Sequence, residues 1–359
     1  MFPLASRNAV AIAAPTSSGT CDPPGASRKT NPSCSDEKRR RTAATSSTVV
    51  DMERAYLGDT GISVSRVILG CGNFGGIGSS PAFFGKGESE EEAFAIMDAA
   101  WEAGITTFDT ADAYGGGRSE TAIGTWLRSR RPDGIVISTK TFNPMAADAD
   151  HGLAPARIRR QLESSLRRLG LERVDMYLTH DWDPDVPIVE TAGALDELVA
   201  EGKIGAYGLS NVDGAQLREA LAAGDFGWVQ NSYSLLDREV EREVLRICAE
   251  HGLGFTPYSP LAGGWLTGKY RRGEQPQAGS RMATRPEPYL GFVDDDRVWA
   301  LLDRLREAGD PATIAFAWLF AQPHVTAVIV GPRRPEQLVP ALAALQRERV
   351  DLQKDTFAF

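Results

Sequence analysis

An aspartate, a lysine and a histidine close three apolar segments that follow one another along the sequence. Asp109 ends TTFD, Lys140 ends IVISTK and His180 ends DMYLTH, while Tyr114 lies five residues after Asp109. If the segments are parallel strands of a barrel, a carboxylate, an ammonium, a phenol and an imidazole meet at one rim. Each residue alone is explained as well by capping, packing or a solvated charge. Four of them after successive segments indicate a catalytic site.

The chemistry open to this set is proton transfer by the phenol. A free phenol has a pKa of about 10, which makes it a reluctant acid at neutral pH. An ammonium beside it favours the phenolate and lowers that pKa, which is the role expected of Lys140. Asp109 would keep Lys140 protonated and in place, and His180 can donate a hydrogen bond to a substrate oxygen. Asp112, the other acid of TTFDTADAYGGG, is expected to bond local backbone in a turn or cap.

A regular alternation of strands and helices must position these side chains. From Met52 onward, apolar segments of strand length alternate with segments of helical period. Strands are expected at 66–70, 106–109, 135–140, 175–180, 204–210, 227–231, 254–258 and 326–330. Helices are expected at 90–103, 119–128, 155–169, 188–201, 215–223, 238–251, 312–321 and 335–345. Eight such pairs predict an α/β fold, a (β/α)8 TIM barrel, with a doubly wound sheet as the alternative.

The segments around this repeat have their own signatures. RAYL-GDTG-ISVS, just before the first barrel strand, predicts a β-hairpin that plugs the barrel floor. Residues 1–51 are rich in Ser, Thr, Ala and Pro, which predicts a disordered extension that either precedes the native start at Met52 or serves as a transit peptide. Residues 52–359 are then one domain. The irregular segment 261–288 is long enough to suggest a functional loop.

Composition restricts the classes of partner. The 359 residues carry a net charge of −9; residues 1–51 hold seven Lys or Arg and four Asp or Glu, so the remainder is about −12. The acidic charge of residues 52–359 disfavours nucleic acid as a partner. The sequence contains no run of about 18 apolar residues, so no membrane span is predicted. The four cysteines, at 21, 34, 71 and 248, form no CxxC pair, so we expect neither a zinc site nor a disulfide framework. A reducing, cytoplasmic location fits this pattern.

One dinucleotide motif is misleading. GCGNFG, residues 70–75, matches G-x-G-x-x-G after a strand, but the last glycine must open a helix if that helix is to face a pyrophosphate. GIGSSPAFFGKGES follows instead, with four glycines and a proline before helical period resumes. No tyrosine is followed by lysine four residues later, so the Tyr-x-x-x-Lys signature is absent as well. A Rossmann reductase is therefore disfavoured.

From about Met52 to the C-terminus the sequence resembles the aldo-keto reductase family. The matching stretches are GITTFDTADAYGGGRSETAIG, VISTK, RRLGLERVDMYLTH, GKIGAYGLSN, VQNSYSLLDR and YSPLAGGWLTGKY. The resemblance implies an oxidoreductase in which Asp109, Tyr114, Lys140 and His180 form the catalytic tetrad. In that chemistry a hydride reaches a carbonyl carbon while Tyr114 protonates the oxygen. No flavin or metal signature is present, so the hydride would come from a nicotinamide.

The resemblance also implies where a cofactor and a substrate would bind. Ser210, Asn211 and Gln230 would bind the carboxamide, and Tyr233 would stack on the nicotinamide ring. The other expected contacts of the cofactor are Gly72, Asn73, Ser259, Leu261, Gly263, Lys269, Gly331, Arg333 and Gln337. Among these, Arg333, or Arg334 as second choice, would bind a 2′-phosphate, so NADP(H) is the expected cofactor. Aromatic residues of the rim loops, Phe74 and Trp182 first, would line the substrate pocket.

The expected function is NADPH-dependent, reversible reduction of an aldehyde or ketone, with a neutral or sugar-like carbonyl mildly preferred. The alternative is a cofactor-binding regulatory subunit of a partner protein with little turnover, as some members of this family are. Turnover distinguishes the two, because both would bind the nucleotide. The partner expected is a small carbonyl compound rather than nucleic acid or membrane, and the sequence leaves open whether the protein is a monomer or a homo-oligomer.

Overall fold

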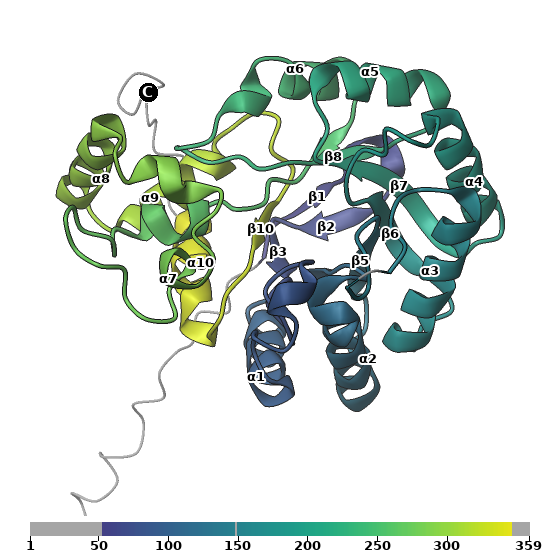
Figure 1. The fold of residues 1–359 in the computed structure, drawn as a ribbon, viewed down its shortest axis with the longest axis horizontal. Coiled ribbons are helices and arrows are strands. Elements are labelled where there is room, and N and C mark those ends of the chain that lie inside the picture. Colours follow the sequence, from purple (N-terminus) through teal and green to yellow (C-terminus); the bar gives the residue numbers. More distant parts are fainter. Residues whose placement is uncertain (1–51, 148, 347–359) are drawn as a thin grey trace, which may run out of the picture. The chain divides into compact units, whose positions relative to one another are not determined.

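Parallel strands of one curled sheet dominate the computed structural model, which describes residues 52–147 and 149–346 (Figure 1). The strands are β3 (Val67–Gly70), β4 (Thr107–Asp109), β5 (Val136–Thr141), β6 (Val174–Thr179), β7 (Ile204–Ser210), β8 (Trp228–Gln230), β9 (Gly254–Phe255) and β10 (Val328–Val330). They pair in the order β10-β3-β4-β5-β6-β7-β8-β9, and every pair is parallel.

Two backbone hydrogen bonds join the ends of this sheet. Thr326 N–H donates to the carbonyl of Phe255 at 2.9 Å, and Ile329 N–H donates to the carbonyl of Pro257, also at 2.9 Å. The segment of β9 therefore meets that of β10, and the sheet closes on itself. This closure confirms the (β/α)8 TIM barrel, and the doubly wound alternative is wrong because such a sheet keeps two open edges.

Helices follow the strands and form an outer layer (Figure 1). They are α1 (Glu90–Glu102), α2 (Arg118–Arg130), α3 (Pro155–Leu169), α4 (Ile188–Ala200), α5 (Gly214–Ala223), α6 (Val244–Glu250), α9 (Pro311–Phe320) and α10 (Val339–Gln346). All lie within two or three residues of the predicted ranges except α6 and α10. These two begin later, because separate 3-10 turns at Glu239–Glu241 and Pro335–Leu338 precede them. Ser89 and Asp213 each close a capping box, which fixes where α1 and α5 begin.

Two further helices were not predicted. α7 (Arg281–Thr284) is one turn inside the segment expected to be irregular, and α8 (Asp296–Ala308) follows it. α8 buries Val298, Leu301, Leu302 and Leu305, at positions i, i+3, i+4 and i+7. That spacing is the helical pattern itself, so the signal for α8 was present in the sequence although the helix was not predicted.

The predicted hairpin covers one end of the barrel. β1 (Arg54–Tyr56) pairs antiparallel with β2 (Ser63–Ser65), and Leu57 and Val64 are fully buried. These two side chains join the interior cluster that includes Ile68, Met176 and Trp228. The hairpin thus fills the floor with apolar side chains and leaves the carboxyl ends of the strands for the site. The disordered extension predicted for residues 1–51 lies outside the described residues, and the assignment of residues 52–359 to one domain stays a prediction.

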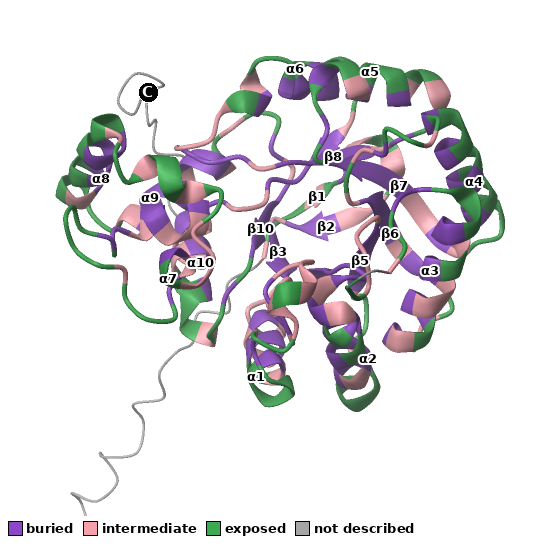
Figure 2. Cartoon of the chain, viewed as in Figure 1, coloured by how far each residue is buried: buried purple, intermediate pink, exposed green. Residues whose placement is uncertain are grey.

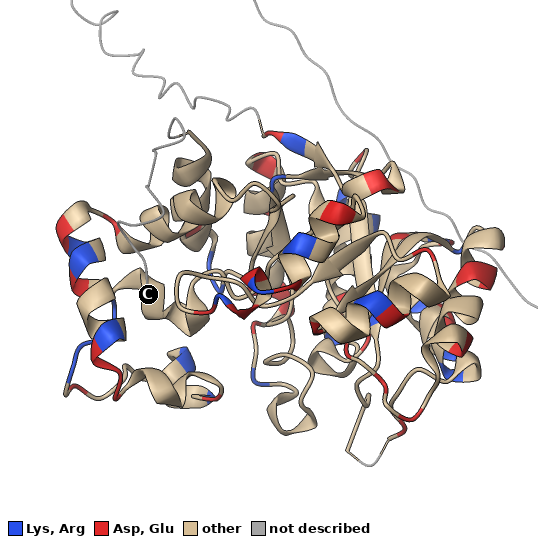
Figure 3. Cartoon of the chain, turned by 90° about the horizontal axis from the view of Figure 1, so that it is seen from above, with Lys and Arg blue, Asp and Glu red and all other residues tan. Residues whose placement is uncertain are grey.

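The outer helices separate apolar from charged surface. Their buried positions face the sheet and their exposed positions face outward (Figure 2). Acidic and basic residues are interspersed along these helices (Figure 3). None of the helices in the described part of the chain is long and apolar enough to cross a membrane.

Candidate active site

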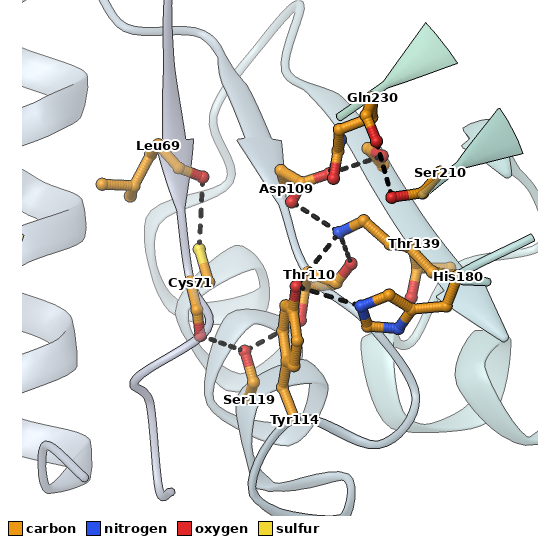
Figure 4. A network of polar contacts seen from close by, with 12 residues as sticks. Leu69, Cys71, Asp109, Thr110, Tyr114, Ser119, Thr139, His180, Ser210 and Gln230 are labelled. Atoms are coloured by element: carbon orange, nitrogen blue, oxygen red, sulfur yellow. Dashed lines mark hydrogen bonds and ion pairs between the residues drawn. The ribbon is translucent and has the colours of Figure 1, made fainter. Parts of the chain in front are cut away.

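The four residues predicted at the strand ends meet at the carboxyl end of the barrel. Asp109 is the last residue of β4, Lys140 is the fifth of β5, and His180 follows β6 directly. The Lys140 Nζ lies 2.6 Å from Asp109 Oδ2 and 3.4 Å from the Tyr114 hydroxyl. The Tyr114 hydroxyl in turn lies 3.5 Å from His180 Nε2 (Figure 4). The last two distances are at the long limit of hydrogen bonding, as is common before a substrate binds.

Glycines explain how Tyr114 reaches this point. It begins a 3-10 turn, and the three residues after it, Gly115, Gly116 and Gly117, have φ of 60°, 67° and 90°. A Cβ on Gly115 would lie 2.8 Å from the backbone of Gly75, so a side chain there would collide with the neighbouring loop. The run of glycine after the phenol therefore turns the chain sharply into α2 and packs it against the loop after β3.

Asp109 and Lys140 form a fixed, buried pair behind the phenol. Lys140 is fully buried and also donates to the Thr110 carbonyl at 2.8 Å. Asp109 Oδ1 accepts from the hydroxyl of Ser138 at 2.9 Å and from Nε2 of Gln230 at 3.1 Å. Each carboxylate oxygen thus has a donor, which a buried charge requires. Although burial opposes it most strongly, Asp109 and Tyr114 together raise the pKa of Lys140, so the ammonium is retained.

The phenol and the imidazole both rest in their neutral forms. Burial raises the pKa of Tyr114, and Asp109 adds to the rise, while Lys140 lowers it. The net direction is opposite to the one expected from sequence, because desolvation of the phenolate outweighs the ammonium. Burial and then Lys140 hold the pKa of His180 well below its usual value. A neutral phenol and a neutral imidazole then face the same space, and Nε2 is the imidazole nitrogen that faces it.

A cavity of about 480 Å³ opens in front of Tyr114 and His180. Ser210, Asn211 and Gln230, the three residues expected to bind a carboxamide, lie in its wall. Asn211 has φ of 59°, unusual for a residue other than glycine, and its side chain bridges the His180 carbonyl and the Tyr258 hydroxyl. Hydroxyl and amide groups here can both donate and accept, as a carboxamide requires. The wall also contains Gly78, Ser79, Ser80, Pro81, Asn143, Pro144, Asp181, Tyr258 and Arg285.

The structure does not bring Tyr233 to this cavity. Its ring is fully buried against Phe255 and Trp318, and its hydroxyl donates to Glu241 at 2.6 Å. The expectation that Tyr233 stacks on a nicotinamide is therefore wrong. Tyr258 is the described aromatic residue in the cavity wall besides Tyr114 and His180. It ends the predicted strand 254–258, so the reasoning from strand ends that found Asp109 would have found it too.

The aromatic residues expected to line the substrate pocket also lie elsewhere. Phe74 is 1% exposed within the core, and Trp182 packs against the same core, outside the cavity wall. Both assignments are corrected: the outer wall is mixed, formed by the polar residues Ser79, Ser80, Asn143, Asp181 and Arg285 together with Gly78, Pro81 and Pro144. No strand-end rule points to most of these residues, because they lie in loops whose path depends on packing.

The loop after β9 provides left-handed backbone where a pyrophosphate was expected. Ser259 and Ala262 have φ of 54° and 45°, and Gly263 and Gly264 follow with 64° and 90°. Successive left-handed residues expose backbone N–H groups that form an anion-binding concavity. The ring of Tyr289 covers this loop: its hydroxyl lies 3.2 Å from the Ser259 hydroxyl, and a Cβ on Gly263 would lie 2.3 Å from the ring. Of the other expected contacts, Gly72 faces the Tyr114 ring, and the Asn73 carbonyl accepts from Glu88 N–H.

Arg333 lies in an ion pair. Its Nε is 2.5 Å from Oε1 of Glu88, which is buried, and its Nη1 donates to the Gly279 carbonyl at 2.7 Å. Burial raises the pKa of Glu88 and Arg333 lowers it, with a net rise. Arg334 pairs with the exposed Glu336. Burial, and then the charges of Arg333 and Arg334, lower the pKa of Lys269, so these three cations form a basic cluster.

Two further predicted contacts, Gly331 and Gln337, lie in the same segment after β10 as Arg333. The side chain of Gln337 accepts from Arg333 N–H at 2.7 Å. It therefore stabilises its own loop, and its amide oxygen is already engaged rather than available to contact an adenine. Gly331 is exposed just after β10. Nothing in the sequence links Glu88 to Arg333, since 245 positions separate them.

Asp112 has neither the turn nor the cap role expected of it. It is fully buried, and its Oδ2 accepts from the Thr141 hydroxyl at 2.7 Å, while Oδ1 has no partner among the described residues. Thr141 in turn accepts from Arg157, and its carbonyl accepts from His180 N–H. Burial, and then Glu120, raises the pKa of Asp112 to about 7. The side chain therefore bonds across to the end of β5, the strand that carries Lys140, at the residue whose carbonyl holds the backbone of His180.

This carboxyl predicts a pH dependence of stability. Asp112 binds a proton more tightly in the folded chain than in the unfolded chain, so its ionisation destabilises the fold as pH rises from about 4 to about 7. Asp112→Asn removes that effect. The free energy of unfolding of the variant, relative to that of the wild type, should therefore rise by about 1.4 kcal/mol per pH unit in this window. Urea unfolding from pH 4 to 8 measures the difference. The exposed Asp133→Asn serves as control, and parallel curves for Asp112→Asn and the wild type would contradict the prediction.

Comparison with known proteins extends over the whole barrel. Residues 66–357 match the family model for the aldo/keto reductase family. The chain is 37% identical over 315 residues to the uncharacterized oxidoreductase YrpG of Bacillus subtilis (strain 168), covering 82% of this chain and 91% of that protein. It is 34% identical over 311 residues to the NADH-specific methylglyoxal reductase of Escherichia coli (strain K12), covering 82% and 94%. The solved structure of aldo-keto reductase AKR11C1 from Bacillus halodurans (holo form) is similar with a TM-score of 0.69 and 27% identity, covering 83% of this chain and 92% of that one.

Proposed function

Because the chain belongs to the aldo/keto reductase family, and is thus an oxidoreductase, we propose that it reduces an aldehyde or ketone to the alcohol with a proton from Tyr114. The reaction is reversible in principle. The observation that carries this proposal is the position of the Tyr114 hydroxyl, within 3.5 Å of both Lys140 Nζ and His180 Nε2, at the wall of a cavity. A small carbonyl compound is the substrate, and a cytoplasmic location belongs to the same proposal.

In this mechanism the protein stabilises the oxygen that becomes anionic. A bound nicotinamide supplies the hydride. His180 donates a hydrogen bond from Nε2 to the carbonyl oxygen, which orients it and shares the developing charge. Tyr114 gives its proton to that oxygen, and the phenolate left behind is stabilised by the ammonium of Lys140. Asp109 keeps that ammonium charged and fixed in place.

The residues of the cavity wall suit a nicotinamide. Ser210, Asn211 and Gln230 would bind the carboxamide, and Tyr258 takes the stacking role first assigned to Tyr233. The loop of Ser259, Leu261 and Gly263, in which Ser259 and Gly263 are left-handed, would bind the pyrophosphate, with Lys269 beside it. These roles are supported by the chemistry of the side chains and backbone groups. Amide and hydroxyl groups can hydrogen-bond to both the N–H and the C=O of a carboxamide, and exposed backbone N–H groups can donate to a diphosphate.

We propose NADP(H) as the preferred cofactor, with Arg333 binding the 2′-phosphate. The guanidinium lies in a cluster with Arg334 and Lys269, but Glu88 offsets part of its charge. The cluster would therefore favour NADPH over NADH less strongly than it would if Arg333 had no carboxylate partner. NADH specificity is part of the name of the Escherichia coli relative, which makes this preference the first one to measure.

Glu88 predicts a change in cofactor preference. Glu88→Gln removes the opposing charge and should lower the KM for NADPH by about tenfold, since a charge-assisted hydrogen bond contributes about 1.5–3 kcal/mol, while the KM for NADH stays unchanged. Arg333→Ala should raise the KM for NADPH by a similar factor. Initial rates with each nucleotide give both values. Glu336→Gln, which breaks the exposed pair with Arg334, is the matched control and should change the KM less than twofold by the weakness of surface pairs. Equal use of both nucleotides by the wild type would exclude the role of Arg333.

A screen of carbonyl compounds, with oxidation of NADPH followed by absorbance and repeated with NADH, tests the proposed reaction. Consumption of nucleotide that depends on an aldehyde or ketone supports it. Tight binding of nucleotide without turnover on any carbonyl would instead favour the regulatory subunit.

A further inference from the structure

An arginine without a carboxylate partner lies in the wall of the catalytic cavity. Arg285 follows α7, in the long segment between β9 and β10, and it is half-buried. Its Nη1 makes one long hydrogen bond, 3.4 Å, to the carbonyl of Ile77. Its guanidinium also lies 5.4 Å from the centroid of the Phe83 ring. No acidic side chain of residues 52–147 or 149–346 lies within ion-pair distance of it.

The position of Arg285 within the cavity is defined by the loop after β3. A Cβ on Gly78 would lie 3.3 Å from Nη1, so the guanidinium packs directly on this loop. Ser79 and Ser80 of the same loop also line the cavity, and Asn143 lines it from the loop after β5. The guanidinium, two hydroxyls and an amide therefore form one polar wall. Tyr114 and His180, the catalytic pair, line the same cavity.

Two other arginines near the site are paired with carboxylates. Arg333 pairs with Glu88, and Arg157 lies 3.7 Å from Asp150. Among the described residues of the cavity wall, Asp181 is the one carboxyl; it accepts from the N–H of Trp182, and burial raises its pKa. A guanidinium stays charged at any physiological pH, so the partly enclosed Arg285 gains from an anion brought into the cavity.

We propose that Arg285 selects carbonyl substrates that carry a carboxylate. The planar guanidinium presents paired N–H donors that match the two oxygens of a carboxylate, and the pairing is stronger where water is partly excluded. Ser79, Ser80 and Asn143 add donors along the same wall. This inference rests on the proposed reduction and narrows its substrate class from any aldehyde or ketone to an oxo acid of low molecular weight, in place of the neutral carbonyl expected from sequence.

A matched pair of aldehydes tests the selection. With the full chain and saturating nucleotide, kcat/KM is measured for 4-oxobutanoate and for butanal, which have the same number of carbons and differ in the carboxylate. The wild type should prefer 4-oxobutanoate. Arg285→Met should lower kcat/KM for 4-oxobutanoate by about 10–100-fold, the range of a charge-assisted contact, and leave butanal within about twofold. Lys86→Met is the control, because Lys86 lies over the same Phe83 ring but outside the cavity wall.

A second measurement does not depend on turnover. Succinate, which has no carbonyl to reduce, should raise the melting temperature of the nucleotide-bound wild type and of Lys86→Met, but not that of Arg285→Met. If succinate stabilises the wild type through Arg285 while neither these aldehydes nor any carbonyl of the screen is reduced, Arg285 still binds a carboxylate and the proposed reduction is wrong. Equal losses on both aldehydes in Arg285→Met, no preference in a wild type that reduces them, or stabilisation by succinate that survives Arg285→Met would each overturn the inference.

Discussion

Tyr114→Phe should lower kcat for carbonyl reduction by about 10²–10⁴-fold, the range that a positioned general acid contributes. The variant loses the only hydroxyl among the described residues that lies between Lys140 Nζ and His180 Nε2, and with it the proton for the carbonyl oxygen. The ring itself remains, so its packing on Gly72 is preserved. Steady-state kinetics on the best carbonyl substrate measures the loss.

Nucleotide binding separates a chemical defect from a structural one. The dissociation constant for NADPH, measured by quenching of tryptophan fluorescence, should change less than twofold in Tyr114→Phe. Tyr56→Phe, at a tyrosine that is 72% exposed on the hairpin, makes the same chemical change far from the cavity and should keep full activity. Wild-type kcat in Tyr114→Phe would remove Tyr114 from the proposed role.

Lys140→Met should abolish measurable reduction and also destabilise the barrel. Methionine leaves Asp109 as a buried carboxylate without its cation, and breaking such a pair costs about 3–5 kcal/mol of unfolding free energy. The catalytic loss has a separate cause, because the phenolate formed at Tyr114 then has no ammonium beside it. Chemical denaturation and kinetics on the same preparation give the two effects.

A double variant distinguishes these two effects. Asp109→Asn in the Lys140→Met background removes the unpaired charge, so much of the lost stability should return while reduction stays absent. Ser138 and Gln230 still have an oxygen to donate to in the double variant, because asparagine keeps one acceptor. Recovery of activity together with stability would show that Lys140 acts only by holding the fold.

Much of the site follows from local pattern. Strand length, helical period and the turn residues predicted the eight β/α repeats, and parallel strands that close a barrel must present their ends at one rim. Asp109, Lys140 and His180 were predicted for that reason, and Tyr114 for its place beside them. Tyr258 obeys the same rule, whereas the resemblance in VQNSYSLLDR predicted Tyr233 in its place.

The barrel and the chemical groups at its rim are predictable from the sequence alone, because periodicity and strand ends are properties of short segments. The charges that act on those groups are set by the tertiary fold. It paired Arg333 with Glu88 across 245 positions, turned Asp112 inward to Thr141, and brought Arg285 against Gly78. The pKa of Tyr114 is raised rather than lowered for the same reason, since desolvation depends on everything packed around a group. Contacts between distant loops leave no period in a single sequence, so their partners appear only once the chain is folded.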